Sequence, residues 1–256
     1  MPRFSAHLAY LFTERPFLER FGAAAAAGFK AVEQQFPYDV PPAALAAELK
    51  KHDLTQLAIN TPLSPEFGLA AQPGREREFE ADFKRALDYV TTIGGTGIHC
   101  MAGVVPVHAR PAAEKAYIAN LTRAAPEAAR HNITLLIEPI NPRDRPDYYL
   151  RHLEHAADIV AKVGAPNLRI QFDFYHLQIM GGDLLARFEK FLPLIGHVQV
   201  AAVPLRNEPE TGEVNFPFIF EEIDRLGYKG WIGCEYKPSG RTEDGLGWAK
   251  PYGIGQ

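Results

Sequence analysis

The sequence is poor in cysteine and has no long apolar run. Its 256 residues include only two cysteines, Cys100 and Cys234, and each lies inside a short apolar stretch. A disulfide framework is therefore excluded, and this cysteine content fits a reduced compartment. No run approaches the roughly 18 apolar residues that a membrane-spanning helix needs. Residues 1–12 lack the basic start and the long apolar stretch of a secretory signal peptide. We therefore expect a cytoplasmic protein.

An excess of positive charge is also missing. The chain has 27 Lys and Arg against 31 Asp and Glu, which gives a net charge of −4. It therefore has no excess of positive charge with which to bind nucleic acid or anionic lipid. We expect a small-molecule substrate, with no nucleic acid and no membrane as a partner, and the sequence leaves open whether the chain forms a homo-oligomer. The G-x-S-x-G, Walker, H-E-x-x-H and C-x-x-C motifs are absent as well, which argues against the chemistries that they serve.

What the sequence does contain is a regular alternation of short apolar runs with longer helical patterns. Strands are predicted at residues 4–8, 31–35, 56–60, 97–103, 134–140, 168–174, 195–202 and 230–236. Eight strands, each followed by a helix, in about 250 residues are typical of the α/β class and of a (β/α)8 TIM barrel. We predict one such domain over residues 1–256. A doubly wound open sheet is the alternative, but no G-x-G-x-x-G follows the first strand.

The predicted helices alternate with these strands. They cover residues 17–27, 42–51, 75–92, 112–130, 151–163, 183–192 and 217–226, and a short last segment covers residues 242–249. The clearest is 75–92, in which four apolar residues recur at helical spacing as one stripe: Phe79, Phe83, Leu87 and Val90. Pro126 is expected to kink or restart the helix at 112–130, because proline lacks a backbone donor and its ring clashes with the preceding turn.

Four predicted strands carry an oxygen-bearing side chain near their carboxyl end: Glu138, Asp173, Gln199 and Glu235, spaced by 35, 26 and 36 residues. The carboxyl ends of barrel strands form the active-site face, so we expect these side chains to meet around one metal ion. Three carboxylates about 4 Å apart repel each other by roughly 4 kcal/mol per pair at an effective dielectric near 20, and a divalent cation removes that cost. Oxygen ligands favour Mg²⁺ or Mn²⁺, with about two positions left for substrate or water. For each residue alone, the alternative is a helix cap or a pair with an arginine.

Three further residues are predicted near the same mouth. His176 lies three residues after Asp173 and is a candidate to hydrogen-bond a substrate oxygen. Arg206 follows the seventh strand, and its guanidinium group suits a carboxylate substrate because it can bind one with two parallel hydrogen bonds. Lys237 follows Glu235 and is a similar but less supported candidate. For each of the three, an ordinary loop residue is the alternative.

Buried polar residues are predicted beneath the metal site. His197 and Gln171 alternate with Gln199 and Asp173, so each points to the same side one layer deeper. We interpret them as hydrogen-bond partners of the ligands, with satisfied core polar groups as the alternative. Glu33 ends the second strand and is interpreted as a structural or supporting group.

These residues stand in stretches that resemble the hydroxypyruvate isomerase family, including its 2-oxo-tetronate isomerase branch, among the xylose isomerase-like barrels. The matching stretches span nearly the whole chain and include RFSAHL, FPYD, PGRE, MAGVVP, LLIEPIN, DFYHLQ, GHVQVA and GWIGCEYKPSGRTEDGLGW. The resemblance implies a divalent metal held by Glu138, Asp173, Gln199 and Glu235, with Glu138 and Glu235 as the acid–base pair. The related sugar epimerases have a substrate-binding histidine three positions after the aspartate, which matches His176.

Two features depart from the family pattern near the mouth. The loop after the third strand, residues 61–76, is shorter than expected, and the second strand has Gln34 and Gln35 where apolar residues are usual. Both leave the size of the substrate open.

The resulting hypothesis is an aldose–ketose type isomerase that moves a carbonyl between adjacent carbons of a short hydroxy-oxo acid. Hydroxypyruvate with tartronate semialdehyde, and 2-oxo-tetronate, are the candidate substrates, and the route passes through an enediolate. A metal-assisted hydride shift is the alternative route. Alternative functions are a 3-epimerase of free keto-sugars, a DNA-repair endonuclease of this barrel superfamily and a catalytically silent sugar-binding barrel. The net charge and the lack of clustered histidines at the other strand ends argue against the endonuclease.

Overall fold

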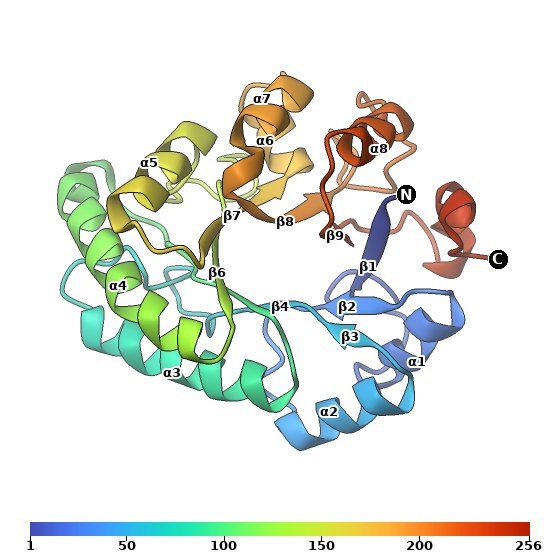
Figure 1. The fold of residues 1–256 in the computed structure, drawn as a ribbon, viewed down its shortest axis with the longest axis horizontal. Coiled ribbons are helices and arrows are strands. Elements are labelled where there is room, and N and C mark those ends of the chain that lie inside the picture. Colours follow the sequence, from blue (N-terminus) through green and yellow to red (C-terminus); the bar gives the residue numbers. More distant parts are fainter.

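The computed structural model describes residues 1–256, which form a closed parallel barrel of strands surrounded by helices (Figure 1). The strands pair in the order β3-β2-β1-β9-β8-β7-β6-β5-β4. Their bounds are β1 Arg3–His7, β2 Ala31–Glu33, β3 Thr55–Gln56, β4 Ala58–Asn60, β5 Gly97–His99, β6 Thr134–Ile137, β7 Leu168–Asp173, β8 Ile195–Val200 and β9 Trp231–Cys234. All pairings are parallel, as expected for strands joined through helices.

The ring is closed by the segment that contains β3 and β4. β3 pairs with β2 and β4 pairs with β5, and only Leu57 separates them. Leu57 itself bonds to both sides, donating to the Val32 carbonyl at 2.9 Å and accepting from the Thr96 N–H at 3.0 Å. β3 and β4 are therefore two parts of one barrel strand, and the predicted α/β class and (β/α)8 barrel are confirmed.

The helices lie outside the ring of strands (Figure 1). They are α1 Glu19–Ala26, α2 Pro42–Lys51, α3 Glu76–Thr92, α4 Arg110–Arg130, α5 Leu153–Val163, α6 Phe174–Met180, α7 Leu184–Phe191 and α8 Phe216–Arg225, with 3-10 segments η1 Val107–Ala109, η2 Leu192–Leu194 and η3 Glu243–Tyr252. Except for α6, the α-helices differ from the predicted ranges by no more than two residues at either end. The stripe on α3 is buried as predicted.

Two features of the helices differ from the sequence prediction. Helix α4 does not restart at Pro126 but continues through it to Arg130. Pro126 and Thr122 are both exposed, so water can solvate the Thr122 carbonyl that loses its helical donor. The short helix α6 was not predicted. It begins directly after Asp173, whose side chain accepts a hydrogen bond from the Tyr175 N–H at 2.8 Å and so caps the new helix.

The barrel interior and the space between strands and helices are filled by one connected set of buried apolar side chains. Aromatic rings form much of the layer outside β7, where Phe172 and Phe174 pack edge-on or stacked against Phe188 of α7. This packing fixes the strands, and with them the side chains at their carboxyl ends. None of the helices is both long enough and apolar enough to cross a membrane.

Candidate active site

The carboxyl ends of the strands bring polar side chains from around the whole ring to one face of the barrel. Pairing places His7 beside Glu33, Asn60 beside His99, and Asp173 beside Gln199. Glu138 and Glu235 each follow the last residue of their strand by one position. The four predicted metal ligands therefore lie on the same face, as the strand-end pattern indicated.

A cavity of about 270 Å³ opens at this face. Its lining comes from loops after seven of the eight barrel strands, from the ends of β4 and β5, and from helix α6. It consists of Tyr10, Gln35, Phe36, Asn60, Phe67, His99, Met101, Glu138, Ile140, Asp144, Arg145, His176, Arg206 and Glu235. This volume suits a small polar metabolite. A larger groove of about 630 Å³ lies between α1, α2 and η3, but no strand-end residue lines it.

Three buried carboxylates form the acidic centre of the site. Glu138 and Glu235 are 5% exposed and Asp173 is 1% exposed. Burial, together with the nearby charges of Glu235 and Asp173, raises the pKa of Glu138 well above its usual value. Burial also raises the pKa of Asp173 to about 7, although Arg206 opposes the rise. The pKa of Glu235 is raised to about 7 by burial, again against the effect of Arg206.

Two fully buried oxygens of this centre have no hydrogen-bond partner. They are Oε1 of Glu138 and Oδ2 of Asp173, and both are buried. Asp173 uses its other oxygen, Oδ1, to cap helix α6. The helix-cap alternative therefore holds for one oxygen of Asp173 and leaves the second one available. Unpartnered carboxylate oxygens in a buried acidic cluster are costly without a cation, so the residues present fit a bound divalent metal.

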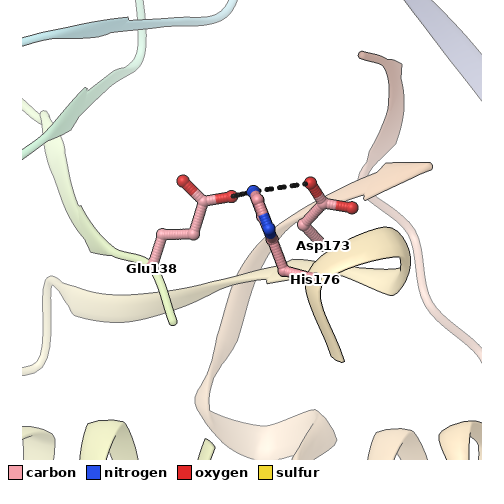
Figure 2. A group of neighbouring side chains, drawn as sticks. All are labelled: Glu138, Asp173 and His176. Carbon is pink, nitrogen blue, oxygen red and sulfur yellow. Dashed lines mark ion pairs between the residues drawn. The ribbon is translucent and has the colours of Figure 1, made fainter. Parts of the chain in front are cut away.

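His176 stands between the two unpartnered oxygens (Figure 2). Its Nε2 lies 3.9 Å from Oε1 of Glu138 and 3.6 Å from Oδ2 of Asp173. Glu138, Asp173 and His176 each offer one ligand atom within 4.8 Å of the others, a group that can hold a metal ion. Burial lowers the pKa of His176 well below its usual value, so the ring is neutral.

The protonated nitrogen of His176 follows from its neighbour Asn141. The Asn141 backbone N–H points at Nδ1 from 3.4 Å, and the side-chain nitrogen of Asn141 lies 2.6 Å from the same atom. A backbone N–H can only donate, so Nδ1 is the acceptor and the single ring proton resides on Nε2. His176 therefore presents an N–H group to the cavity, between Glu138 and Asp173.

Gln199 lies beside Asp173 and is held in a buried hydrogen-bond network. Its Oε1 accepts from Nε2 of Gln171 at 2.7 Å, and its own Nε2 lies 3.5 Å from Oε1 of Glu33. Glu33 in turn lies 2.5 Å from Nε2 of His197. Burial alone would raise the pKa of Glu33, but His197, His7 and Gln199 together hold it below its usual value. Gln171 and Glu33 both hydrogen-bond to Gln199, whereas His197 contacts Glu33 and no predicted ligand.

Arg206 reaches into the acidic centre. Its Nη2 lies 2.7 Å from Oε1 of Glu235 and 3.8 Å from Oδ2 of Asp173, and its Nη1 lies 3.0 Å from Oδ2 of Asp144. The guanidinium also lies over the rings of Tyr10 and Tyr175. The backbone of Arg206 has a positive φ of 59°, a conformation that costs energy for a non-glycine residue and is typical of functional positions.

Lys237 stays outside this arrangement. Its side chain is exposed and does not line the cavity. Its backbone N–H donates to the Arg206 carbonyl at 2.7 Å, so Lys237 supports the loop that carries Arg206. The structure thus brings together Glu138, Asp173, Glu235, His176 and Arg206. It places Gln199 beside Asp173 and leaves the Lys237 side chain apart.

Sequence reasoning missed two histidines that end strands. His7 ends β1 and His99 ends β5, with one ring nitrogen 3.6 Å from Glu235 and from Glu138, respectively. The expectation that histidines do not cluster at the other strand ends was therefore wrong. Burial lowers the pKa of His7 to about 4 and that of His99 to about 3, so both rings are neutral. Reading the polar residues in the carboxyl half of all eight predicted strands, rather than of four, would have found them.

A parallel barrel with a buried acidic cluster and a small cavity at the carboxyl ends of its strands is typical of enzymes that act on small molecules. The family model of xylose isomerase-like TIM barrels matches residues 21–252. The chain is 49% identical to the 2-oxo-tetronate isomerase of Cupriavidus necator, with 98% of this chain and 99% of that protein covered. It is 40% identical to the hydroxypyruvate isomerase of Escherichia coli, with 98% and 100% covered.

A solved structure is similar throughout. The crystal structure titled as an AP endonuclease, family 2, from Brucella melitensis has a TM-score of 0.97 and 46% sequence identity, with 98% of this chain and 99% of that chain covered. The chain belongs to the hydroxypyruvate isomerase and 2-oxo-tetronate isomerase family within the xylose isomerase-like barrels. Its class is therefore that of an isomerase.

Proposed function

We propose that this chain interconverts the aldehyde and ketone forms of a short hydroxy-oxo acid, either hydroxypyruvate with tartronate semialdehyde or a 2-oxo-tetronate. The observation that carries the proposal is the buried cluster of Glu138, Asp173 and Glu235 at a cavity of about 270 Å³. Its family relatives are named as isomerases of such acids. The size of the cavity supports a three- or four-carbon substrate.

We propose Mg²⁺ or Mn²⁺ as the cofactor, held by Glu138, Asp173, Gln199 and Glu235. The unpartnered oxygens of Glu138 and Asp173 support this set. Gln199 already accepts one hydrogen bond at Oε1 from Gln171, and an amide oxygen has a second lone pair for a metal. Oxygen ligands alone favour these hard ions. A bound divalent ion would polarise the substrate carbonyl and neutralise negative charge that develops on its oxygens.

His176 has a separate role in this proposal. Because its proton is on Nε2, its free ring position is a hydrogen-bond donor rather than a metal ligand. It would donate to a substrate oxygen held between Glu138 and Asp173. Carboxylates and an amide then supply the metal ligands, and the neutral histidine orients the substrate.

Glu138 and Glu235 are proposed as the acid–base pair. One carboxylate removes the proton from the hydroxyl-bearing carbon, which leaves an enediol, and the other returns a proton to the neighbouring carbon. The hydroxyl proton moves to the former carbonyl oxygen, so atoms balance between substrate and product. In the metal-free protein, burial raises the pKa of Glu235 to about 7. A bound divalent ion would lower this pKa and favour the ionised form, which can remove a proton. Each glutamate lies beside a neutral buried histidine, His99 or His7, which does not compete for the charge.

The test is turnover of metal-loaded Glu138→Gln and Glu235→Gln. Each substitution removes one proton-transfer group, and kcat should fall by about 10²- to 10⁴-fold. Glu80→Gln, at an exposed position of helix α3, is the control and should keep wild-type turnover. Near-full turnover by either active-site variant, with metal binding verified, would refute its assigned role.

Isotope exchange and substrate range separate the alternatives. In deuterated water, the enediol route puts deuterium on the carbon that receives the proton, whereas a hydride shift leaves it unlabelled. Turnover of fructose or tagatose with none of the oxo acids would favour a keto-sugar 3-epimerase.

The endonuclease alternative has a counterpart in the Brucella melitensis structure, which is described as an AP endonuclease, family 2. The small cavity and the net charge of −4 speak against duplex DNA as a substrate of this chain. Cleavage of DNA with an abasic site, at enzyme levels that leave the oxo acids unchanged, would reverse this choice.

A further inference from the structure

Two arginines line the cavity, and they differ in what neutralises them. Arg206 is surrounded by three carboxylates, those of Glu235, Asp144 and Asp173. Its charge is therefore compensated from within the protein. Arg145 has no carboxylate oxygen within 4.0 Å of its guanidinium nitrogens and makes no side-chain hydrogen bond. Arg145 is the cation at this cavity that is available to an anionic ligand.

The guanidinium of Arg145 is held against an aromatic ring. Its central carbon lies 3.5 Å from the centre of the Phe67 ring, in the loop after β4. Stacking on one face of a planar guanidinium leaves its edge donors free, and those edges bind carboxylates with two parallel hydrogen bonds. The side chain of Arg145 is half-buried, so an ion pair there would be screened less than one on the open surface.

The loop that carries Phe67 adopts a costly backbone conformation to place this ring. Phe67 has a positive φ of 62°, which is unfavourable for a bulky aromatic residue. The next residue, Gly68, has a φ of 125°, and any side chain there would collide with the Met101 carbonyl. The Glu66 carbonyl accepts from the Val104 N–H at 2.6 Å and anchors the loop to the wall of the cavity. The surroundings thus fix Phe67 in a conformation that the sequence alone disfavours.

The loop that carries Arg145 is fixed as firmly. The Arg145 N–H donates to the Asn141 carbonyl at 3.1 Å, and the Asp144 N–H donates to Oδ1 of Asn141 at 2.9 Å. The carboxylate of Asp144 binds Arg206 and also accepts from the Tyr175 hydroxyl at 3.1 Å. Adjacent residues therefore have opposite tasks: Asp144 neutralises Arg206, and Arg145 presents an uncompensated charge to the cavity.

We propose that Arg145, braced by Phe67, binds the carboxylate of the substrate and gives the site its preference for oxo acids over neutral sugars. This inference rests on the proposed function and assigns to Arg145 the role that sequence reasoning gave to Arg206. The carbonyl and hydroxyl of the substrate then face the acidic centre. The carboxylates that surround Arg206 would repel a second anion there.

The test compares binding of D-glycerate and glycerol to metal-loaded protein by calorimetry or ligand-observed NMR. D-Glycerate has the carboxylate and hydroxyls of the substrate but no carbonyl, so it does not turn over, and glycerol is its neutral counterpart. Arg145→Gln should weaken D-glycerate binding by about 10- to 100-fold, the range for charge-assisted hydrogen bonds. Glycerol binding should change by less than about twofold. Arg143→Gln, an exposed position two residues away, is the matched control and should match wild type.

Two further variants protect the test against misfolding. Arg145→Lys keeps the charge but not the planar pair of donors and should restore part of the lost affinity. Phe67→Leu keeps an apolar side chain but removes the stacking surface and should weaken D-glycerate binding by several-fold. With hydroxypyruvate, Arg145→Gln should raise KM more than it lowers kcat, because it removes binding present before and during reaction.

The outcomes separate this inference from the proposed function. If wild-type protein isomerises hydroxypyruvate but Arg145→Gln binds D-glycerate as tightly as wild type, the role of Arg145 is refuted and the function stands. If the wild-type protein turns over no oxo acid, but Arg145→Gln binds D-glycerate more weakly than wild type, the function is refuted and the anion site stands. Equal affinity of wild-type protein for D-glycerate and glycerol also refutes the anion site.

Discussion

Glu235→Gln should make the metal-free protein more stable at alkaline pH, although it should inactivate the enzyme. Glu235 is buried among Glu138, Asp173 and Glu33, and its ionised form is unfavourable there without a cation. Glutamine has the shape of the protonated form and keeps an oxygen for the Arg206 N–H group that now binds Glu235. Arg206 also retains Asp144 and Asp173 as partners.

The magnitude follows from the pKa of Glu235. Its pKa rises from 4.5 to about 7 on folding, a difference of about 2.5 pH units, and each unit corresponds to 1.36 kcal/mol. Below about pH 4.5 both states are protonated and the group has no effect on stability. Between about 4.5 and 7 the folded state binds more protons, so the free energy of unfolding falls as pH rises. At pH 8 the cost reaches about 3 kcal/mol, and Glu235→Gln should recover most of it.

Urea unfolding at pH 5 and pH 8, with EDTA present, measures this effect. The stability difference between variant and wild type should be about 3 kcal/mol at pH 8 and below about 1 kcal/mol at pH 5. Glu80→Gln, in an exposed pair with Lys84, should change stability by less than about 0.5 kcal/mol at both pH values. The reasoning would be refuted if the variant were less stable than wild type at pH 8, or if the stability difference did not depend on pH. Either result would show that burial does not destabilise the ionised Glu235 carboxylate.

Two other predictions concern the same cluster. Mn²⁺ should stabilise the wild-type protein more at pH 8 than at pH 5, measured as a larger rise in Tm. Asp173 and Glu235 each have a pKa of about 7 without the ion and must lose their protons to bind it. A rise in Tm that does not change with pH would contradict carboxylate ligation. Gly233→Ala should lower the free energy of unfolding in urea by about 1–3 kcal/mol. Its new methyl group would collide with the Glu33 carboxylate, which contacts Gln199 and His197. Gly240→Ala is the control, because a methyl group there would meet open space.

The barrel and the position of its active face were predictable from the sequence because two simple rules apply to them. Apolar runs of strand length alternate with helical patterns, and parallel strands connected through helices place all their carboxyl ends on one face. A residue that follows such a run, such as Glu138 or Glu235, is then located without knowing any side-chain contact. The position of a residue at a strand end thus fixes its backbone, and it predicts the side chain as well where the strand determines its direction.

The partners of flexible side chains were not predictable in the same way. Arg206 looked available to a substrate, but Asp144, 62 residues earlier, is close enough to bind it. Lys237 lies two residues after Glu235, and strand alternation would place both on the same side. However, β9 ends at Cys234, and the Lys237 side chain beyond it is exposed. Both outcomes depend on where loops from different strands meet, which hydrophobic periodicity does not encode.

The residues that sequence reasoning missed share a physical property. His7 and His99 end their strands as Glu138 and Glu235 do, but they are neutral when buried, with pKa values of about 4 and 3. Burying a neutral ring costs far less than burying a carboxylate, so a histidine at the end of an apolar run is not conspicuous. A carboxylate in the same place is conspicuous because it needs a compensating charge. Sequence signals at such a site therefore identify the groups that need a cation, and the neutral groups that shape their environment are found only from the fold.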